Sequence, residues 1–152
     1  MQERPQDPLL LVCFLLNNHD VRYLVVGGHA CILHGLVRTT EDVDILIQDD
    51  EENFRRVIAG LSEMSDGAAR ELTVDDLRDN VVVKVADEVE VDISKSAWTV
   101  SYADAIADAE SIKIDGIRIP FVSLKQLIRS KETYREEDRG DLIRLRKIRD
   151  ER

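Results

Sequence analysis

The sequence predicts an α/β (α+β) fold in which one mixed β-sheet is flanked by helices and followed by a C-terminal helical pair. Three observations support this: helical and strand periodicities alternate, a glycine pair follows an apolar strand, and two amphipathic helical patterns come last. The 152 residues, 43% of them hydrophobic, suffice for one domain with a buried core. We therefore expect a single domain with an N-terminal helix (1–20), an α/β core (21–119) and C-terminal helices (120–152).

The first half of the chain alternates helices with strands. The expected elements are helices over 8–18, 29–36 and 51–61 and strands over 23–27 and 42–47. Gly27 and Gly28 interrupt the first strand and turn the chain sharply into the next helix. Acidic residues open the helix at Glu51, where carboxylates complement the partial positive charge of a helix N-terminus.

The second half contains two hairpin patterns and then the helical pair. The expected elements are strands over 80–86, 89–93, 111–114 and 117–119, a helix capped by Ser123, and a last helix that includes Leu142 and Ile148. Turns are expected at Asp87-Glu88 and at Asp115-Gly116, where Asp-Gly is a strong signal. Pro120 is expected to close the second hairpin, and Gly140 to separate the two final helices.

The charge distribution limits the classes of partner. The chain has a formal net charge of −10, but from Arg118 onward 11 basic side chains face only 7 acidic ones. A protein of this kind is unsuited to coating duplex DNA. The longest early apolar run, residues 9–16, is too short to cross a bilayer. We expect a cytoplasmic protein with neither a membrane nor duplex DNA as a partner.

Cysteine and aromatic residues are few and have ordinary structural interpretations. Cys13 and Cys31 lie in apolar segments without Cys-x-x-Cys spacing, which indicates reduced core thiols. Only 5% of residues are aromatic, which disfavours a stacking surface for single-stranded nucleic acid. Trp98 is expected to anchor the core rather than to stack on a base.

Three carboxylates form the candidate catalytic centre. Asp42 and Asp44 are two apart in a strand, so their side chains face the same way. Adjacent carboxylates repel one another unless cations neutralise them, and Mg²⁺ bound by such a pair keeps open positions for phosphate. Asp92 on a later strand is the expected third carboxylate, preferred to Glu90 because its surroundings are more apolar. The three residues would bind two Mg²⁺ ions.

The glycine pair suggests a place for phosphate. Gly27 and Gly28 permit a sharp strand-to-helix turn whose free backbone N–H groups can hold a triphosphate. Neither Gly-Gly nor Asp-x-Asp is specific by itself, because glycine turns and acidic strand ends are common. Their ordered combination is what indicates chemistry on a nucleotide.

This combination resembles the nucleotidyltransferase superfamily with the DNA polymerase β-like fold. The resemblance rests on Gly27-Gly28, the pair Asp42 and Asp44, and a third aspartate, Asp92. It implies catalytic and metal-binding roles for the three aspartates, with Asp92 also helping to remove the proton of an attacking hydroxyl. The nucleotide would be contacted by Gly27, Gly28, His29, Arg38, Thr40, Lys131 and Arg135.

The chain also resembles a small bacterial branch of the superfamily, the AbiEii-type toxin nucleotidyltransferases. The motif from Arg38 to Asp44 carries this resemblance, together with Lys131, Arg135 and Asp138. Lys131 and Arg135 are four apart and would share a helix face, either contacting the triphosphate or forming an ordinary salt-bridge ladder. Arg38 would either hold a phosphate or pair with Glu41 or Asp42.

Two positions depart from the superfamily pattern. His29 stands where polymerase-like members often have serine, and Glu137 stands where a lysine is usual. The resemblance implies Mg²⁺-dependent transfer of a nucleoside monophosphate from a nucleoside triphosphate, such as ATP, to a hydroxyl of a tRNA or other RNA, a protein or a small molecule. The alternatives are a partner-binding module of a toxin–antitoxin pair, with a cognate toxin or antitoxin protein, and a metal-dependent hydrolase.

Overall fold

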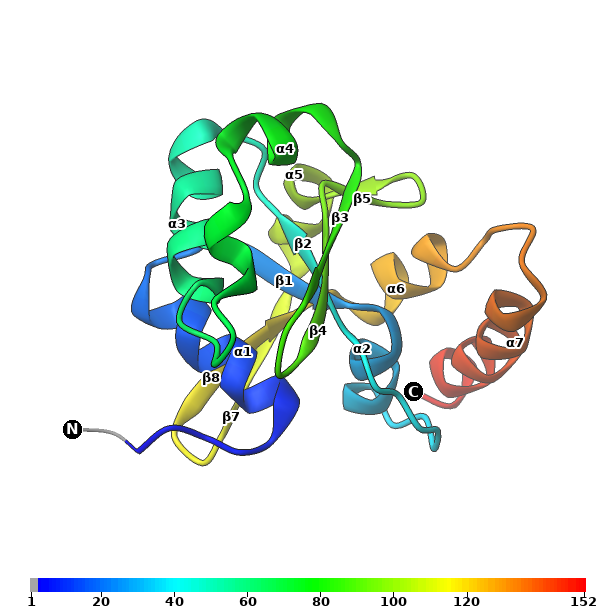
Figure 1. The fold of residues 1–152 in the computed structure, drawn as a ribbon. Coiled ribbons are helices and arrows are strands. Elements are labelled where there is room, and N and C mark those ends of the chain that lie inside the picture. Colours follow the sequence, from blue (N-terminus) through cyan, green and yellow to red (C-terminus); the bar gives the residue numbers. More distant parts are fainter. Residues whose placement is uncertain (1–2) are drawn as a thin grey trace.

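The computed structural model describes residues 3–152 and shows one mixed sheet between two groups of helices (Figure 1). The α-helices are α1 (Pro8–Asn18), α2 (Gly27–Leu33), α3 (Glu51–Leu61), α4 (Val74–Asp79), α5 (Tyr102–Ala105), α6 (Leu124–Ser130) and α7 (Glu136–Glu151). Short 3₁₀ helices cover Ala68–Glu71 (η1) and Ile106–Asp108 (η2). The strands are β1 (Tyr23–Val26), β2 (Val43–Ile47), β3 (Val82–Ala86), β4 (Glu90–Ser94), β5 (Ser96–Ala97), β6 (Val100–Ser101), β7 (Glu110–Ile114) and β8 (Ile117–Phe121).

The main sheet has six strands in the order β3-β4-β2-β1-β8-β7, and β5 and β6 form a separate small hairpin. Strand β1 pairs antiparallel with β2 and parallel with β8, while β2 pairs parallel with β4. The outer strands β3 and β7 pair antiparallel with their hairpin partners. The mixed α/β architecture expected from the alternating periodicities is therefore confirmed.

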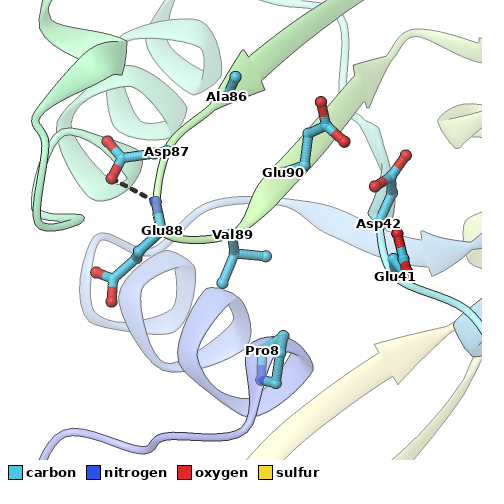
Figure 2. A pocket seen from close by; sticks show the side chains of 8 residues that line it. All are labelled: Pro8, Glu41, Asp42, Ala86, Asp87, Glu88, Val89 and Glu90. Atoms are coloured by element: carbon cyan, nitrogen blue, oxygen red, sulfur yellow. Dashed lines mark hydrogen bonds between the residues drawn. The ribbon is translucent and has the colours of Figure 1, made fainter.

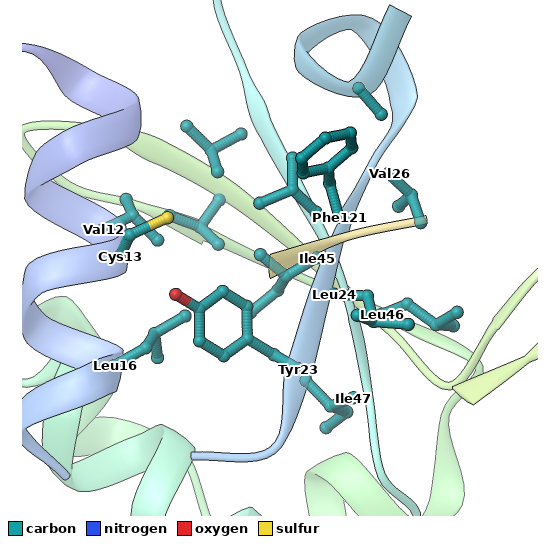
Figure 3. Packing of buried hydrophobic residues seen from close by; sticks show 14 of the residues in the cluster. Val12, Cys13, Leu16, Tyr23, Leu24, Val26, Ile45, Leu46, Ile47 and Phe121 are labelled. Carbon is teal, nitrogen blue, oxygen red and sulfur yellow. The ribbon is translucent and has the colours of Figure 1, made fainter. Parts of the chain in front are cut away.

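The two faces of the sheet are covered differently. Helices α1 and α3 lie on one side of the sheet in Figure 1, and α2, α6 and α7 lie on the other. Figure 3 shows Val12, Cys13 and Leu16 of α1 packed toward Tyr23 on the first side. All four of these residues are buried, and both cysteines are free thiols. Alternation along β1 turns Leu24 to the opposite side, so both faces of the central strands are covered by helices.

Helix starts follow local capping chemistry. The Asp7 side chain accepts from the backbone N–H of Leu10 at the start of α1, and Asp50 accepts from Asn53 at the start of α3. Ser123 caps α6, as the sequence predicts, by accepting from the N–H of Gln126.

The C-terminal helical pair is present, but its boundary differs from the prediction. Gly140 lies inside α7, so the prediction that it separates the helices is wrong, and the break is the 131–135 loop instead. The acidic first turn of α7 starts the helix at Glu136, and an isolated glycine in a helix costs only about 1 kcal/mol.

The hairpin that contains Pro120 is longer than expected. Pro120 lies within β8 rather than closing it, opposite Ser111 of β7. A proline without an N–H is tolerated there because β8 pairs with β1 at Phe121, the next residue.

None of the helices in residues 3–152 has the length and apolar composition needed to cross a membrane.

Candidate active site

Asp44 and Asp92 lie side by side at the centre of the sheet. The parallel register of β2 and β4 pairs Val43 with Val91 and Asp44 with Asp92. Both valines are fully buried on the other face, so strand alternation turns both carboxylates toward the side of the sheet that carries α2 and α6. The structure therefore brings together two of the three aspartates that the sequence selects.

This carboxylate pair is electrostatically strained. Burial raises the pKa of Asp44 to about 7, and the adjacent carboxyl of Asp92 adds to the increase. Oδ1 of Asp92 is buried and has no hydrogen-bond partner. Two close carboxylates with an unpaired buried oxygen are the donor set that a hard divalent cation binds. The pair therefore fits Mg²⁺, although within residues 3–152 no three His, Cys, Asp or Glu side chains converge as a ready cluster.

A lysine that the sequence analysis missed lies among the acidic groups. Lys84 Nζ is 3.7 Å from Asp92 Oδ1, 3.8 Å from Glu90 Oε1 and 3.9 Å from Asp42 Oδ2. Its position follows from the β3–β4 register, which pairs Lys84 with Asp92. Asp42 directly precedes β2, and the Lys84 ammonium group lies near both its carboxylate and that of Asp92. Lys84 thus partly neutralises the carboxylates of the site.

The position of Lys84 opposite Asp92 was not predicted from the sequence, because the hairpin turn was expected at Asp87-Glu88. The turn contains one residue more, since Ala86 pairs with Glu90 and Val89 lies in the turn. The Asp87 carboxylate holds this turn by accepting from the backbone N–H groups of Glu88, Asp66 and Ala68. A one-residue change of register moves every cross-strand partner, so the tighter turn would have placed Val83 opposite Asp92.

The glycine pair lies directly against the site. Gly27 has a φ of +66°, and a Cβ atom there would lie 2.1 Å from Asp44 Oδ2. At Gly28, an added Cβ would lie 2.5 Å from Thr40 Oγ1. The first glycine is therefore required both by the left-handed backbone and by the close approach of the carboxylate.

A polar cavity of about 540 Å³ opens beside the carboxylate pair. The polar cavity is lined by Gly28, residues 38–42, Asp44, Asp92, Lys131, Arg135, Glu137, Asp138 and Asp141. Five of the seven residues expected to contact the nucleotide line it, namely Gly28, Arg38, Thr40, Lys131 and Arg135. Gly27 and His29, which precede and follow Gly28, do not. Gly27 lines a second cavity next to it. His29 is half-buried, its Nε2 has no hydrogen-bond partner, and burial lowers its pKa.

The cationic residues of the polar cavity pair differently from the sequence-based expectations. Arg38 Nη1 donates to Asp141 Oδ2 at 2.5 Å, so neither Glu41 nor Asp42 is its partner. Lys131 caps the end of α6 and Arg135 precedes α7, so the prediction that they share one helix face is wrong. The 131–135 loop separates them.

Asp138 nevertheless brings both cations together. Its carboxylate is 3.3 Å from Lys131 Nζ and accepts from Arg135 Nε at 2.8 Å. Burial by itself raises the pKa of Asp138, but the hydrogen bonds from Arg135 and Thr133 and the Lys131 ammonium outweigh it and hold the pKa below its ordinary value. Asp138 therefore fixes the positions of both cations.

The second cavity, of about 420 Å³, adjoins the same carboxylates and contains two aromatic residues that the sequence analysis did not place in the site. We name it the aromatic cavity; its lining includes Asp44, Asp92, Val82, Ala97, Trp98 and Tyr134. The expectation that Trp98 anchors the core is wrong, because its side chain lies in the turn after β5 and is 50% exposed. Only the three-dimensional fold places this turn beside the 131–135 loop.

Comparisons with known proteins bear on the family and the fold of the chain. The family model for aminoglycoside-2''-adenylyltransferase matches residues 8–145. None of the curated proteins matches the chain. A solved nucleotidyltransferase-like antigenic protein from Paracoccidioides brasiliensis is 19% identical with a TM-score of 0.55, over 90% of this chain and 72% of its own. A Thermotoga maritima protein named for the nucleotidyltransferases is 21% identical with a TM-score of 0.54, over 93% of this chain and 89% of its own.

Proposed function

Because the chain belongs to the aminoglycoside-2''-adenylyltransferase family, we propose that it transfers a nucleoside monophosphate from a nucleoside triphosphate to a hydroxyl of a small cationic acceptor. Family and fold support nucleotidyl transfer in general and confirm the expected superfamily. The AbiEii-type branch is not confirmed. The observation that carries the proposal is the Asp44–Asp92 pair, which lines a cavity that also contains Arg38, Lys131 and Arg135.

Mg²⁺ would be held by Asp44 and Asp92, with Asp42 as the third ligand. The raised pKa of Asp44, caused first by burial and then by Asp92, indicates a site that favours an added positive charge. Bound there, the metal would neutralise charge on the phosphates during transfer. Lys84 would have to give up part of its contact with Asp92 and Asp42 when the metal binds.

The cations of the polar cavity would bind the phosphates. Lys131 and Arg135 are held in place by Asp138, and Arg38 is held by Asp141, so their positions are fixed before a ligand arrives. The acceptor oxygen would attack the α-phosphorus while the bond from that phosphorus to the bridging oxygen breaks, which releases pyrophosphate. Asp92 would take the proton of the attacking hydroxyl.

An acidic groove supports a cationic acceptor. Figure 2 shows Glu41, Asp42 and Glu90 projecting from neighbouring segments into a cavity of about 330 Å³. The nearby carboxylates of Asp87 and Glu88 are already used by backbone N–H groups, so the remaining negative charge of the groove comes from the first three residues, two of which, Asp42 and Glu90, also lie near Lys84. An aminoglycoside, the compound class in the family's name, carries both amines and hydroxyls. A net charge of −10 makes RNA a poorer acceptor.

Label transfer from α-phosphate-labelled nucleoside triphosphates tests this function. The wild-type protein with Mg²⁺ is offered aminoglycosides, total RNA and cell protein in separate reactions, and we expect label on the aminoglycoside fraction. Asp44→Asn and Asp92→Asn should abolish transfer, whereas the exposed control Asp79→Asn should retain it. Label on RNA or protein would overturn the acceptor assignment. Absence of label in every fraction, with a tight complex to a second protein, would favour the partner-binding alternative.

A further inference from the structure

Trp98 is held in an unfavourable backbone conformation at the edge of the aromatic cavity. It lies in the turn between β5 and β6 with a φ of +57°, a left-handed value that is rare for a bulky residue. The side chain remains half exposed, so burial in the core does not offset this strain. A strained residue beside a catalytic centre often has a role in ligand binding.

Tyr134 meets Trp98 from a distant part of the chain. It lies in the 131–135 loop, is 91% exposed, and packs edge-to-face on Trp98 with ring centroids 6.0 Å apart and planes at 87°. Each ring therefore presents apolar surface to solvent next to the site. Exposed apolar surface gathered at one place commonly marks a binding site.

The aromatic cavity and the polar cavity meet at the catalytic carboxylates. Both are lined by Asp44, Asp92, Lys131, Arg135 and Asp138. Beyond these shared residues, the polar cavity adds Arg38 and four further carboxylates, whereas the aromatic cavity adds only uncharged residues, among them Val82, Ala97, Trp98 and Tyr134. The volume of about 420 Å³ falls within the range of small-molecule sites, roughly 300–1,000 Å³.

We propose that Trp98 and Tyr134 bind the base of the nucleoside triphosphate, a specificity subsite that rests on the proposed function. With the reacting phosphate at Asp44 and Asp92 and the remaining phosphates among Lys131, Arg135 and Arg38, the nucleoside extends into the adjoining aromatic cavity. A cationic acceptor would bind in the acidic groove rather than in the aromatic cavity, because the groove carries negative charge. Stacking on aromatic rings accepts every base, because each base has a π-face, so this subsite provides affinity with modest selectivity among bases.

Trp98 is the only tryptophan of the chain, so its fluorescence reports directly on the aromatic cavity. The full chain is titrated, with Mg²⁺, against ATP, GTP, CTP and UTP and against inorganic tripolyphosphate. We expect at least one nucleotide to change the Trp98 emission. Tripolyphosphate should raise Tm but leave the Trp98 emission unchanged. Tripolyphosphate contains the charge of the ligand but lacks the base.

Substitutions separate stacking from folding. Trp98→Ala and Tyr134→Ala should weaken nucleotide binding about tenfold or more, measured by calorimetry, and leave tripolyphosphate binding unchanged. Trp98→Phe and Tyr134→Phe retain a ring and should bind nucleotide nearly as well as the wild type. Unchanged tripolyphosphate binding also shows that each alanine variant is folded.

Two results would overturn the base subsite, and they differ in what they imply for the proposed function. If the alanine variants bind nucleotide as tightly as the wild type, or if an aminoglycoside changes the Trp98 emission and nucleotides do not, the base lies elsewhere while nucleotidyl transfer still stands. If neither nucleotide nor tripolyphosphate binds, the subsite and the proposed function both fail.

Discussion

The Gly27 backbone approaches the Asp44 side chain so closely that a Cβ atom on Gly27 would lie 2.1 Å from Asp44 Oδ2. Gly27 directly follows β1, and Asp44 of β2 pairs with the last residue of β1, Val26. The turn and the catalytic carboxylate therefore occupy space that only glycine leaves free.

Gly27→Ala should lower both stability and activity. The left-handed φ of +66° and the clash with Asp44 should reduce the free energy of unfolding by about 1–3 kcal/mol, and displacement of the carboxylate should reduce label transfer. Gly140→Ala is the matched control, because an added Cβ there meets nothing and alanine favours a helix interior by about 1 kcal/mol. Urea denaturation of both variants checks the prediction, which fails if they change stability in the same direction.

Asp44→Asn should separate stability from function. Removing one charge from the buried pair relieves repulsion with Asp92, so the metal-free protein should gain of order 1 kcal/mol in the free energy of unfolding. Loss of the carboxylate should abolish label transfer, because the site then lacks one of its metal-binding groups. Thermal unfolding without metal and transfer assays with Mg²⁺ give the two values. A destabilised but active variant would contradict this interpretation of the pair.

Lys131→Met should weaken nucleotide binding. Lys131 Nζ lies 3.2 Å from Asp141 Oδ2 and 3.3 Å from Asp138 Oδ1, and the residue lines both cavities. We expect about a tenfold loss of affinity, of the size that one charge-assisted hydrogen bond provides. Lys125→Met on the same α6 helix is the control, because Lys125 is exposed and lines neither cavity. Equal binding by the two variants would exclude Lys131 from the phosphate site.

Asp138→Asn should change how stability depends on pH. The pKa of Asp138 is lowered in the folded protein, where hydrogen bonds and Lys131 outweigh burial, so its contribution is present above the ordinary pKa and is lost as pH falls through the folded value. Asp138 is 2% exposed, and its replacement should cost about 2 kcal/mol at pH 7 and progressively less in acid. Urea denaturation from pH 7 down to a pH below the ordinary pKa of an aspartate checks the difference, with the exposed Asp150→Asn as control. Parallel curves for Asp138→Asn and the wild type would contradict it.

The regular elements were predictable where local signals agree. Helix α3 begins at Glu51 and ends at Leu61 as predicted, because an acidic first turn and amphipathic spacing both mark it. Helix α4 was missed although Thr73 and Asp76 form a capping box, a local signal that could have found it. The position of Gly140 inside α7 shows that one glycine is too weak a signal to end a helix.

The carboxylates of the site were easier to predict than their surroundings. Asp44 and Asp92 follow from strand alternation and a recognisable motif, whereas Lys84 depends on a hairpin register that one residue in the turn decides. The pairing of Arg38 with Asp141, and of Trp98 with Tyr134, joins segments distant in sequence. Such contacts are properties of the folded chain that local spacing does not encode.

The contact between Arg38 and Asp141 also has a consequence for the order of folding. It spans 103 positions, and the polar cavity draws its two sides from the 38–42 segment and from residues 131–141. Contacts of such long separation form slowly compared with local hairpins such as β3–β4 and β7–β8. A refolding molecule should therefore regain its local hairpins before it regains the ability to capture phosphate, and ligand capture becomes a measure of a late stage of folding.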